Sequence, residues 1–301
     1  MTKITKEIVE LGLKEHRAIE DMVFLKKYPL DGEETLQDTK NRIARLVPEE
    51  LKEFVRGDTF LPAGSVLSGA LNDEVSCSLS NCYYTPIEGD SIEHIFDGIK
   101  KMARTYSYRG GTGTSISVLR PRDTKVNNAA KTSSGSVSFM PLLSEVTNTI
   151  GQNGRRGALM ILQNIRHPDT LEFIWSKSKP EEIFGEDPLT GKIPDVFGAN
   201  ISLAITDDFM KAVEHNFDWT FSFPNREADP KKYDEEWDGQ FDKWDGDWAY
   251  YKTMPAREVM RQIAESAWTS GDPGVLFIDT TKKMTPGTQI HPDLEPVGVN
   301  P

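Results

Sequence analysis

The sequence predicts an α/β fold, in which helices cover a mainly parallel sheet, behind a short helical N-terminal segment. From residue 80 onward, short apolar runs typical of strands alternate with segments whose apolar residues recur at helical spacing. Neighbouring parallel strands need a crossover between them, usually a helix, so this alternation indicates a parallel sheet. The 301 residues suffice for one large domain or two modest ones.

Residues 1–56 are expected to form the helical segment. Ile4, Ile8 and Leu11 recur at roughly helical spacing, and a similar pattern returns in LQDTKNRIARLV, residues 36–47. Residues 57–301 then hold the alternation. Strands are predicted at 81–87, 114–120, 158–165, 199–206, 218–223 and 274–279, and helices at 90–111, 140–151, from 167, at 207–215 and at 256–271, before a last apolar run at 296–300.

The helix expected at 90–111 carries its own boundary signals. Asp90 and Glu93 stand at capping-box spacing, basic residues come late and glycine follows, so Asp90 is the expected cap.

Two segments, 179–196 and 225–252, interrupt the alternation with proline, glycine, aspartate and tryptophan. The second is acidic, but it lacks the ligand order and the terminal glutamate of a calcium loop. We expect a solvated insertion at about 225–252, with a few tryptophans packed onto the body.

Charge and composition exclude several classes of protein. The formal net charge of −12 and the pI near 5.0 argue against a surface for duplex DNA or for an anionic membrane. The N-terminal residues lack the apolar core of a signal peptide, and no run of 18 apolar residues occurs, so a cytoplasmic protein is expected. The five histidines are scattered and no Cys-x-x-Cys spacing occurs, so no metal site is expected.

Two glycine-rich stretches separate predicted helices from predicted strands. The first, YSYRGGTGTSISVLRP at 106–121, can bring backbone N–H groups close to a ligand, although a loop that only caps a helix has the same composition. The second, GQNGRRGALM at 151–160, carries Arg155 and Arg156, which suit phosphate or base recognition as well as a solvated turn. By burial statistics alone, Cys82 is more typical of a core cysteine than of a reactive thiol.

Several blocks, taken in order, resemble the catalytic large chain of ribonucleotide reductase. They are FLPAGSVLSGA, LSNCYYTPIEGDSIEHIFDGIKKMA, RGGTGTSISVLRP, SSGSVSFMPLL, GQNGRRGALMIL with HPDTLEFI, ANISLAITDDFMKAV and GDPGVLFID. The resemblance covers roughly residues 57–301 and is strongest to the adenosylcobalamin-dependent branch. It implies the first half of a ten-stranded α/β barrel, made of five parallel strands.

The resemblance also implies roles at the substrate. Cys82 matches the first of two redox cysteines, which reduces the substrate and becomes half of a disulfide. Ser80 and Asn81 match substrate contacts, as does Gly111, whose backbone would lie against the ribose. Gly64 and Ser65 fall near a position that contacts the substrate phosphate.

A second nucleotide, a dNTP or ATP effector, is implied beside the substrate. Asp90 matches an acid that holds the effector ribose, and Arg120 matches a ligand of its phosphates. Residues 121–136 correspond to a first specificity loop, and residues 151–158, with Arg155 and Arg156, to a second.

The last residues, Asn300 and Pro301, match the start of the motif Asn-Pro-Cys-Gly-Glu, whose cysteine carries the radical. The resemblance therefore implies that the chain needs a C-terminal complement and is inactive alone. Its implied cofactor is adenosylcobalamin, with a separate metal-radical subunit as the alternative. The implied partners are a ribonucleotide substrate, a thioredoxin-like or glutaredoxin-like reductant, and a second copy of the chain in a homodimer.

Two other interpretations share these motifs. One is a non-catalytic nucleotide-binding module that keeps only the effector site. The other is a generic α/β nucleotide-binding enzyme, for which the order of the blocks would be a coincidence.

Overall fold

The computed structural model describes residues 19, 22–57, 59–150, 157–291 and 295–299. The chain divides into two compact units, Met1–Asn81 and Cys82–Pro301. Residues 57–81 thus group with the helical segment, whereas the sequence placed the boundary after residue 56. No helix within the described ranges combines the length and the apolar character that a membrane crossing requires.

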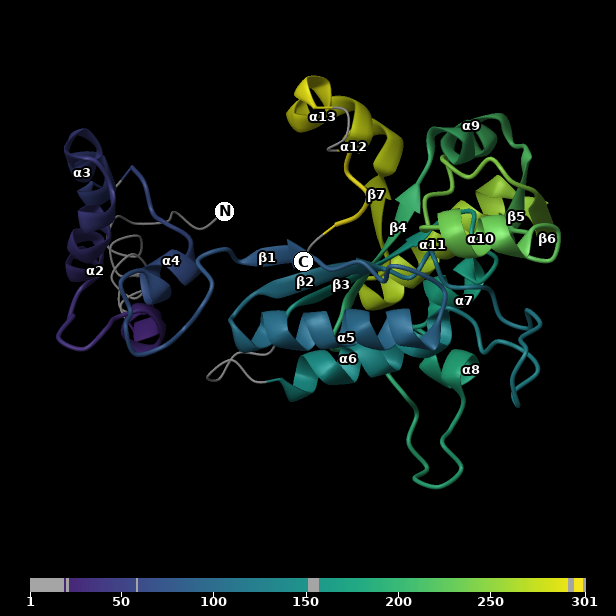
Figure 1. Cartoon of the computed structure of the whole chain (residues 1–301), viewed down its shortest axis with the longest axis horizontal. Helices are drawn as coiled ribbons and strands as arrows, with labels where there is room; N and C mark the ends of the chain where they lie inside the picture. The colour runs from purple at the N-terminus through teal and green to yellow at the C-terminus, as the bar shows by residue number, and fades with distance from the viewer. Residues whose placement is uncertain (1–18, 20–21, 58, 151–156, 292–294, 300–301) are drawn as a thin grey trace, which may run out of the picture. The chain divides into compact units, whose positions relative to one another are not determined.

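The first unit is helical where it is described (Figure 1). Its named helices are α2 (Leu36–Ile43), the 3-10 turn η1 (Ala44–Leu46), α3 (Glu49–Arg56) and α4 (Gly64–Gly69). Thr35 and Asp38 form a capping box at the start of α2. Arg42 fastens α2 to α4, because its buried guanidinium donates to the Leu67 and Ala70 carbonyls and pairs with Glu33 at 2.7 Å.

The second unit is built on a five-stranded parallel sheet, which confirms the predicted α/β class. The strands are β1 (Cys82–Tyr84), β2 (Gly111–Ser115), β3 (Leu159–Asn164), β4 (Asn200–Ile205) and β7 (Gly274–Phe277), in the order β1-β2-β3-β4-β7. Such a sheet is consistent with half of the expected barrel.

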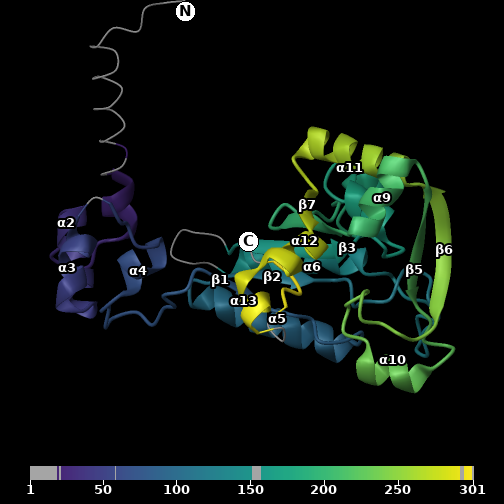
Figure 2. The same ribbon diagram turned by 90° about the horizontal axis from the view of Figure 1, so that it is seen from above.

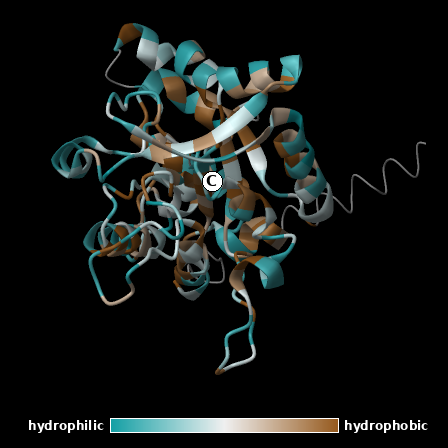
Figure 3. Ribbon diagram, turned by 90° about the vertical axis from the view of Figure 1, so that its right-hand side faces the viewer, coloured by the Kyte–Doolittle hydropathy of each residue, from teal (hydrophilic) through white to brown (hydrophobic). Residues whose placement is uncertain are grey.

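Helices pack on the face of this sheet that meets the main core. They are α5 (Ile92–Ser107), α6 (Met140–Thr149), α7 (Thr170–Trp175), α8 (Pro180–Phe184), α9 (Asp207–His215) and α11 (Ala256–Ser270). Single helices carry both polar and apolar segments (Figure 3), as expected when one side meets the core. Side chains alternate along each strand, so Ile161 and Leu203 pack into the main core while Leu162 and Ala204 meet Ile278 on the other side.

Residues 218–255 depart from the predicted pattern. β5 (Asp218–Pro224) does not join the parallel sheet but pairs antiparallel with β6 (Trp248–Pro255), which was not predicted. Figure 2 shows this pair, with α10 (Pro230–Glu236) nearby, at the opposite side of the second unit from β1. The strand predicted at 274–279 also ends early, because α12 (Ile278–Met284) and α13 (Pro286–Ile290) follow it.

The segment at 225–252 packs several of its aromatic residues onto the body, as expected for its tryptophans, and two further aromatic residues, Tyr233 and Phe241, are buried with them. Tyr233, Trp237, Phe241 and Trp244 are buried and belong to the main core. Phe223 of β5 joins them, with its ring centroid 5.3 Å from that of Trp237. The acidic residues of the segment lie outside this cluster, so the segment is an amphipathic part of the fold and not an appendage.

Candidate functional site

Two predicted substrate residues lie side by side on the sheet. Cys82 of β1 pairs in register with Gly111 of β2. Thr112, the next residue, faces the helices, because its hydroxyl oxygen lies 2.6 Å from that of Tyr106 in α5. Successive residues of a strand point to opposite faces, so Cys82 and Gly111 occupy the face opposite α5.

The glycine stretch is itself a strand. The strand predicted at 114–120 instead spans Gly111–Ser115, so Gly111 belongs to β2 and not to a loop before it. Strand geometry orients the backbone at Gly111, which carries no side chain next to Cys82 in the register.

Both cysteines lie in the described part of the chain, and neither forms a disulfide. Cys82 is half-buried at the start of β1, whereas Cys77 belongs to the first unit, next to Gly69 of α4.

The remaining predicted substrate residues belong to the first unit. Gly64 and Ser65 begin α4, and the buried Ser65 hydroxyl donates to Oδ1 of Asn81. Ser80 is exposed, and its N–H donates to the Ser78 hydroxyl at 3.1 Å. The structure thus brings Ser65 and Asn81 together within this unit.

Asp90 and Arg120, two of the four residues predicted to bind the effector, form a partly buried ion pair. Arg120 donates from its backbone N–H to Oδ1 of Asp90 at 3.0 Å and from Nε to Oδ2 at 2.5 Å. The Tyr233 hydroxyl, from α10, donates to the same Oδ2 at 2.9 Å. Asp90 is not the helix cap, because Ser91 takes that position and accepts the His94 N–H.

Burial disfavours the ionised form of Asp90, and its hydrogen-bond donors favour it. Burial raises the pKa of Asp90, and the Arg120 guanidinium and the Tyr233 hydroxyl oppose that shift. Burial and the negative charge of Asp90 raise the pKa of Tyr233, which therefore stays protonated and donates.

A cavity of about 450 Å³ opens beside this ion pair. Ser91, Ile92 and Ile95 of the α5 start line one part of it, and residues 126–134 line another. These last residues belong to the expected first specificity loop, which forms a small hairpin with a Lys125–Thr132 bridge. The cavity therefore has the size of a small-molecule site, and Asp90 and Arg120 line it.

A second cavity, of about 580 Å³, shares Arg120, Val126 and Asn127 with the first. Its lining adds two cations, Lys125 from the hairpin and Arg226 from the segment after β5. Arg226 is paired with Asp234 at 2.8 Å. Arg120 thus stands between two adjoining hollows.

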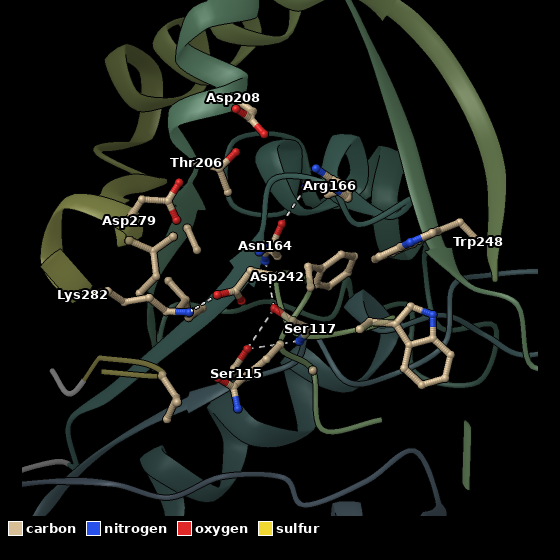
Figure 4. Close-up of a pocket in the computed structure, with 18 residues that line it drawn as sticks. Ser115, Ser117, Asn164, Arg166, Thr206, Asp208, Asp242, Trp248, Asp279 and Lys282 are labelled. Carbon is tan, nitrogen blue, oxygen red and sulfur yellow. Dashed lines mark hydrogen bonds and ion pairs between the residues drawn. The ribbon is translucent and has the colours of Figure 1, made fainter. Parts of the chain in front are cut away.

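A third cavity, of about 420 Å³, lies at the carboxyl ends of β2, β3 and β4. Figure 4 shows Arg166 and Trp248 on one side of it and Lys282 and Asp279 on the other. Ligands of parallel α/β sheets generally bind at these strand ends, but the sequence did not single out Arg166 or Lys282. Their positions in the sequence could have identified them, because Arg166 follows β3 and Lys282 lies in the helix after β7.

Several sequence-based expectations lie outside the described residues. They include Arg155 and Arg156 of the expected second specificity loop, and Asn300 of the expected Asn-Pro motif. The site described above does not include these residues. Among the described residues, no group of three or more His, Cys, Asp or Glu side chains is arranged to hold a metal ion.

Comparison with known proteins matches most of the chain to one family. The model of the ribonucleotide reductase barrel domain matches residues 75–291. This range includes Cys82, Gly111, Asp90 and Arg120.

Relatives of this kind come from distant organisms. The chain is 35% identical to a vitamin B12-dependent ribonucleoside-diphosphate reductase of Thermoplasma acidophilum over 69% of its own length and 23% of the relative. It is 30% identical to a reductase of the same name from Mycobacterium tuberculosis, over 79% of the chain and 29% of the relative. It is also 29% identical to the alpha subunit of a Synechocystis ribonucleoside-diphosphate reductase, over 71% of the chain and 28% of that subunit.

The chain spans about a quarter of the length of these curated relatives. Within that quarter, the matched range carries the parallel sheet, the register pair Cys82–Gly111 and the ion pair Asp90–Arg120. The chain belongs to the ribonucleotide reductase family, and residues 75–291 correspond to its barrel domain.

Proposed function

We propose that this chain takes part in the reduction of ribonucleotides to 2′-deoxyribonucleotides, as part of a reductase that a C-terminal complement completes. The observation that carries the proposal is the register pair Cys82–Gly111 on the face of the sheet opposite α5. A thiol held there, beside a strand without side-chain bulk, can approach a ribose that lies along the backbone.

The chemistry assigns a definite task to Cys82. The C2′–O bond breaks, the oxygen leaves as water, and a C2′–H bond forms. Two thiols supply the two electrons and the hydrogen atoms and become a disulfide; Cys82 is one, and the second would come from the complement. A thioredoxin-like or glutaredoxin-like protein then reduces the disulfide.

None of the three cavities described above fits cobalamin. The three cavities described above measure about 420, 450 and 580 Å³, and each is too small to enclose a corrin ring with its nucleotide tail. Relatives carry vitamin B12 in their names, so cobalamin stays our proposed cofactor for the completed enzyme, but we assign no residue of this chain to it.

Regulation by a deoxynucleoside triphosphate is the second part of the proposal. In this proposal Asp90 accepts a ribose hydroxyl and Arg120 binds phosphate, and the support is that Asp90 lines one of two adjoining cavities and Arg120 lines both. The hairpin at 121–136 lines both cavities, so a nucleotide bound there would contact it directly.

Replacing Cys82 tests the catalytic part. In the completed enzyme, Cys82→Ser is expected to abolish repeated turnover, because a hydroxyl cannot form the disulfide, and to leave effector binding unchanged. Cys77→Ser is the matched control and should keep turnover. The measurement is deoxynucleotide formed per enzyme over many cycles, and normal turnover in Cys82→Ser would refute the role.

Replacing Arg120 tests the effector part. Arg120→Lys keeps a positive charge beside Asp90 but loses the planar fork, so effector affinity should fall about tenfold. Arg122→Lys is the control, because Arg122 lies in the same segment but pairs with Glu172 at 2.8 Å. Calorimetric titration with dATP or dTTP measures the change, and equal affinities in the two variants would contradict the assignment.

The alternative is a nucleotide-binding module without catalysis, which the cavity beside Asp90 favours because it is formed without any part of the Cys82 face. The two functions differ in one outcome. If the completed protein binds effector but forms no deoxynucleotide even in a single turnover with intact Cys82, the module is correct.

A further inference from the structure

The third cavity, at the carboxyl ends of β2, β3 and β4, has no role in the function proposed above. It shares no lining residue with the two cavities at Arg120. Its volume of about 420 Å³ falls in the range of small-molecule sites.

Arg166 is the distinctive residue of this cavity. Its guanidinium carbon lies 5.7 Å from the ring centroid of Trp219 and 5.5 Å from that of Trp248, so two indoles hold it by cation–π contacts. Within the part of the chain that the structure describes, the guanidinium has no carboxylate within ion-pair distance and no hydrogen-bond acceptor. The half-buried guanidinium of Arg166 is therefore held in position, but no negative charge neutralises it.

Hydrogen-bond donors surround the same hollow. The Ser117 oxygen accepts from the Asn164 N–H at 2.8 Å and from the Ser115 hydroxyl at 2.9 Å, so the Ser117 proton is left to donate. Asn164 uses its Oδ1 to accept the Arg166 N–H at 2.9 Å, which leaves its amide N–H groups without an acceptor among the described residues. Unused donors beside an uncompensated cation select a ligand rich in acceptors.

The acids of the lining are already engaged. Asp242 pairs with Lys282 at 2.5 Å, and Lys282 also lies 3.7 Å from Glu295. Asp279 accepts the Asp207 N–H at 2.8 Å, and Asp208 pairs with Lys211 at 3.3 Å. Two of the three lining acids, Asp208 and Asp242, are therefore paired with lysines, and none of the three lies within ion-pair distance of Arg166.

We propose that this cavity binds a small oxyanion ligand, a phosphate ester or a carboxylate, whose oxygens meet the Arg166 guanidinium, the Asn164 amide and the Ser117 hydroxyl. Guanidinium matches both anions with parallel N–H donors. Leu162, Ala204 and Ile278, which also line the cavity, would contact the apolar body of the ligand.

Tryptophan fluorescence tests the proposal on the full chain, because Trp219 and Trp248 contact Arg166. Inorganic phosphate and succinate are titrated separately at constant ionic strength, with chloride as the blank, and calorimetry gives the stoichiometry. We expect one saturable site per chain for at least one of the two anions, and the anion that binds identifies phosphate or carboxylate chemistry.

Variants locate the site. R166Q should weaken anion binding at least about tenfold, whereas R120K, which alters the proposed effector site, should leave it unchanged. N164D places a negative charge among the donors, keeps the acceptor for the Arg166 N–H, and should weaken binding similarly. Thermal unfolding confirms that each variant is folded, and N164D decides the question if R166Q is not.

Three outcomes would overturn the proposal. They are no saturable binding of either anion, equal affinity in R166Q and the unchanged protein, and a loss that follows R120K instead. R120K tests the effector site separately. A negative result at the Arg166 cavity therefore does not refute the proposed effector site, and a negative result at the effector site does not refute the Arg166 cavity.

Discussion

Asp90 carries a negative charge that accepts hydrogen bonds from two distant parts of the chain. It precedes α5, Arg120 follows β2, and Tyr233 belongs to α10. The sequence could not distinguish Asp90 from Ser91 as the helix cap, since both residue types cap well. The structure shows why Ser91 takes the position: Asp90 is already used by Arg120.

Removing the Tyr233 hydroxyl should affect stability in a pH-dependent way. Burial raises the pKa of Asp90, so the folded state binds this proton at a higher pH than the unfolded state, and the group's contribution to the free energy of unfolding falls as pH rises through the folded pKa. Tyr233→Phe removes one donor to the ionised form, so the pKa of Asp90 should rise further.

We therefore expect Tyr233→Phe to lower the free energy of unfolding by about 1–3 kcal/mol while Asp90 is ionised, and by less as the pH falls through its pKa. Urea unfolding at a series of pH values measures this. Tyr250→Phe, at a 73% exposed position, is the control. A loss that is the same at every pH would show that Tyr233 does not act through Asp90.

At the scale of elements, the sequence predicted the bounds of a helix or strand well where a single hydrophobic periodicity dominated the segment. The helix at 256–271 and the strand at 199–206 appear within one residue of their predicted ends, because each has one clear periodicity and clear boundary residues. β6 was missed because its residues are mostly exposed and lack a buried alternating face. Without a visible partner strand, β5 looked like one more member of the parallel sheet.

Trp237 tests whether the segment at 225–252 is part of the core. Its side chain is 6% exposed, and its indole N–H donates to the Val118 carbonyl at 2.8 Å. Trp237→Ala should lower the free energy of unfolding by about 3–5 kcal/mol, because a large cavity and an unpaired carbonyl remain. Trp268→Ala, at an 89% exposed position, should change it by less than about 0.5 kcal/mol. Chemical denaturation compares the two, and similar small effects would contradict a structural role.

At the scale of the whole molecule, α5 presents an apolar surface that nothing in the described chain covers. Ile92 and Phe96, one helical turn apart, are 54% and 51% exposed. Exposed apolar pairs on a helix are typical of association surfaces, so we expect the chain to dimerise through α5.

Phe96→Asp should therefore shift the chain toward monomer, because a charge would be buried in the interface. Leu189→Asp, which changes a 94% exposed loop residue, should leave association unchanged. Sedimentation velocity over a range of concentrations measures both. A protein that is already monomeric at every concentration, or a Phe96→Asp variant that still dimerises, would refute this surface.

The site as a whole was only partly predictable. The resemblance named Cys82, Gly111, Asp90 and Arg120, and the structure pairs the first two and the last two. Tyr233 and Arg166 were not foreseen, because each acts through partners that are distant in sequence: Tyr233 meets Asp90, and Arg166 meets Trp219 and Trp248. Such contacts arise from the sheet and the β5–β6 pair folding together, and no local pattern records them.

The place of β7 in the sheet sets an order for folding. β7 pairs with β4, yet α9, the β5–β6 pair, α10 and α11 all lie between them in the chain. Closing so long a connection costs chain entropy before the β4–β7 contacts can form and offset it. We therefore expect β7 to join the sheet late in folding. During synthesis, β4 leaves the ribosome well before β7. Until β7 pairs with it, the edge of β4 that faces β7 has unpaired backbone hydrogen-bonding groups. Nascent chains paused in this interval would be prone to pair with each other, and a chaperone that holds them until β7 leaves the ribosome should raise the yield of native protein.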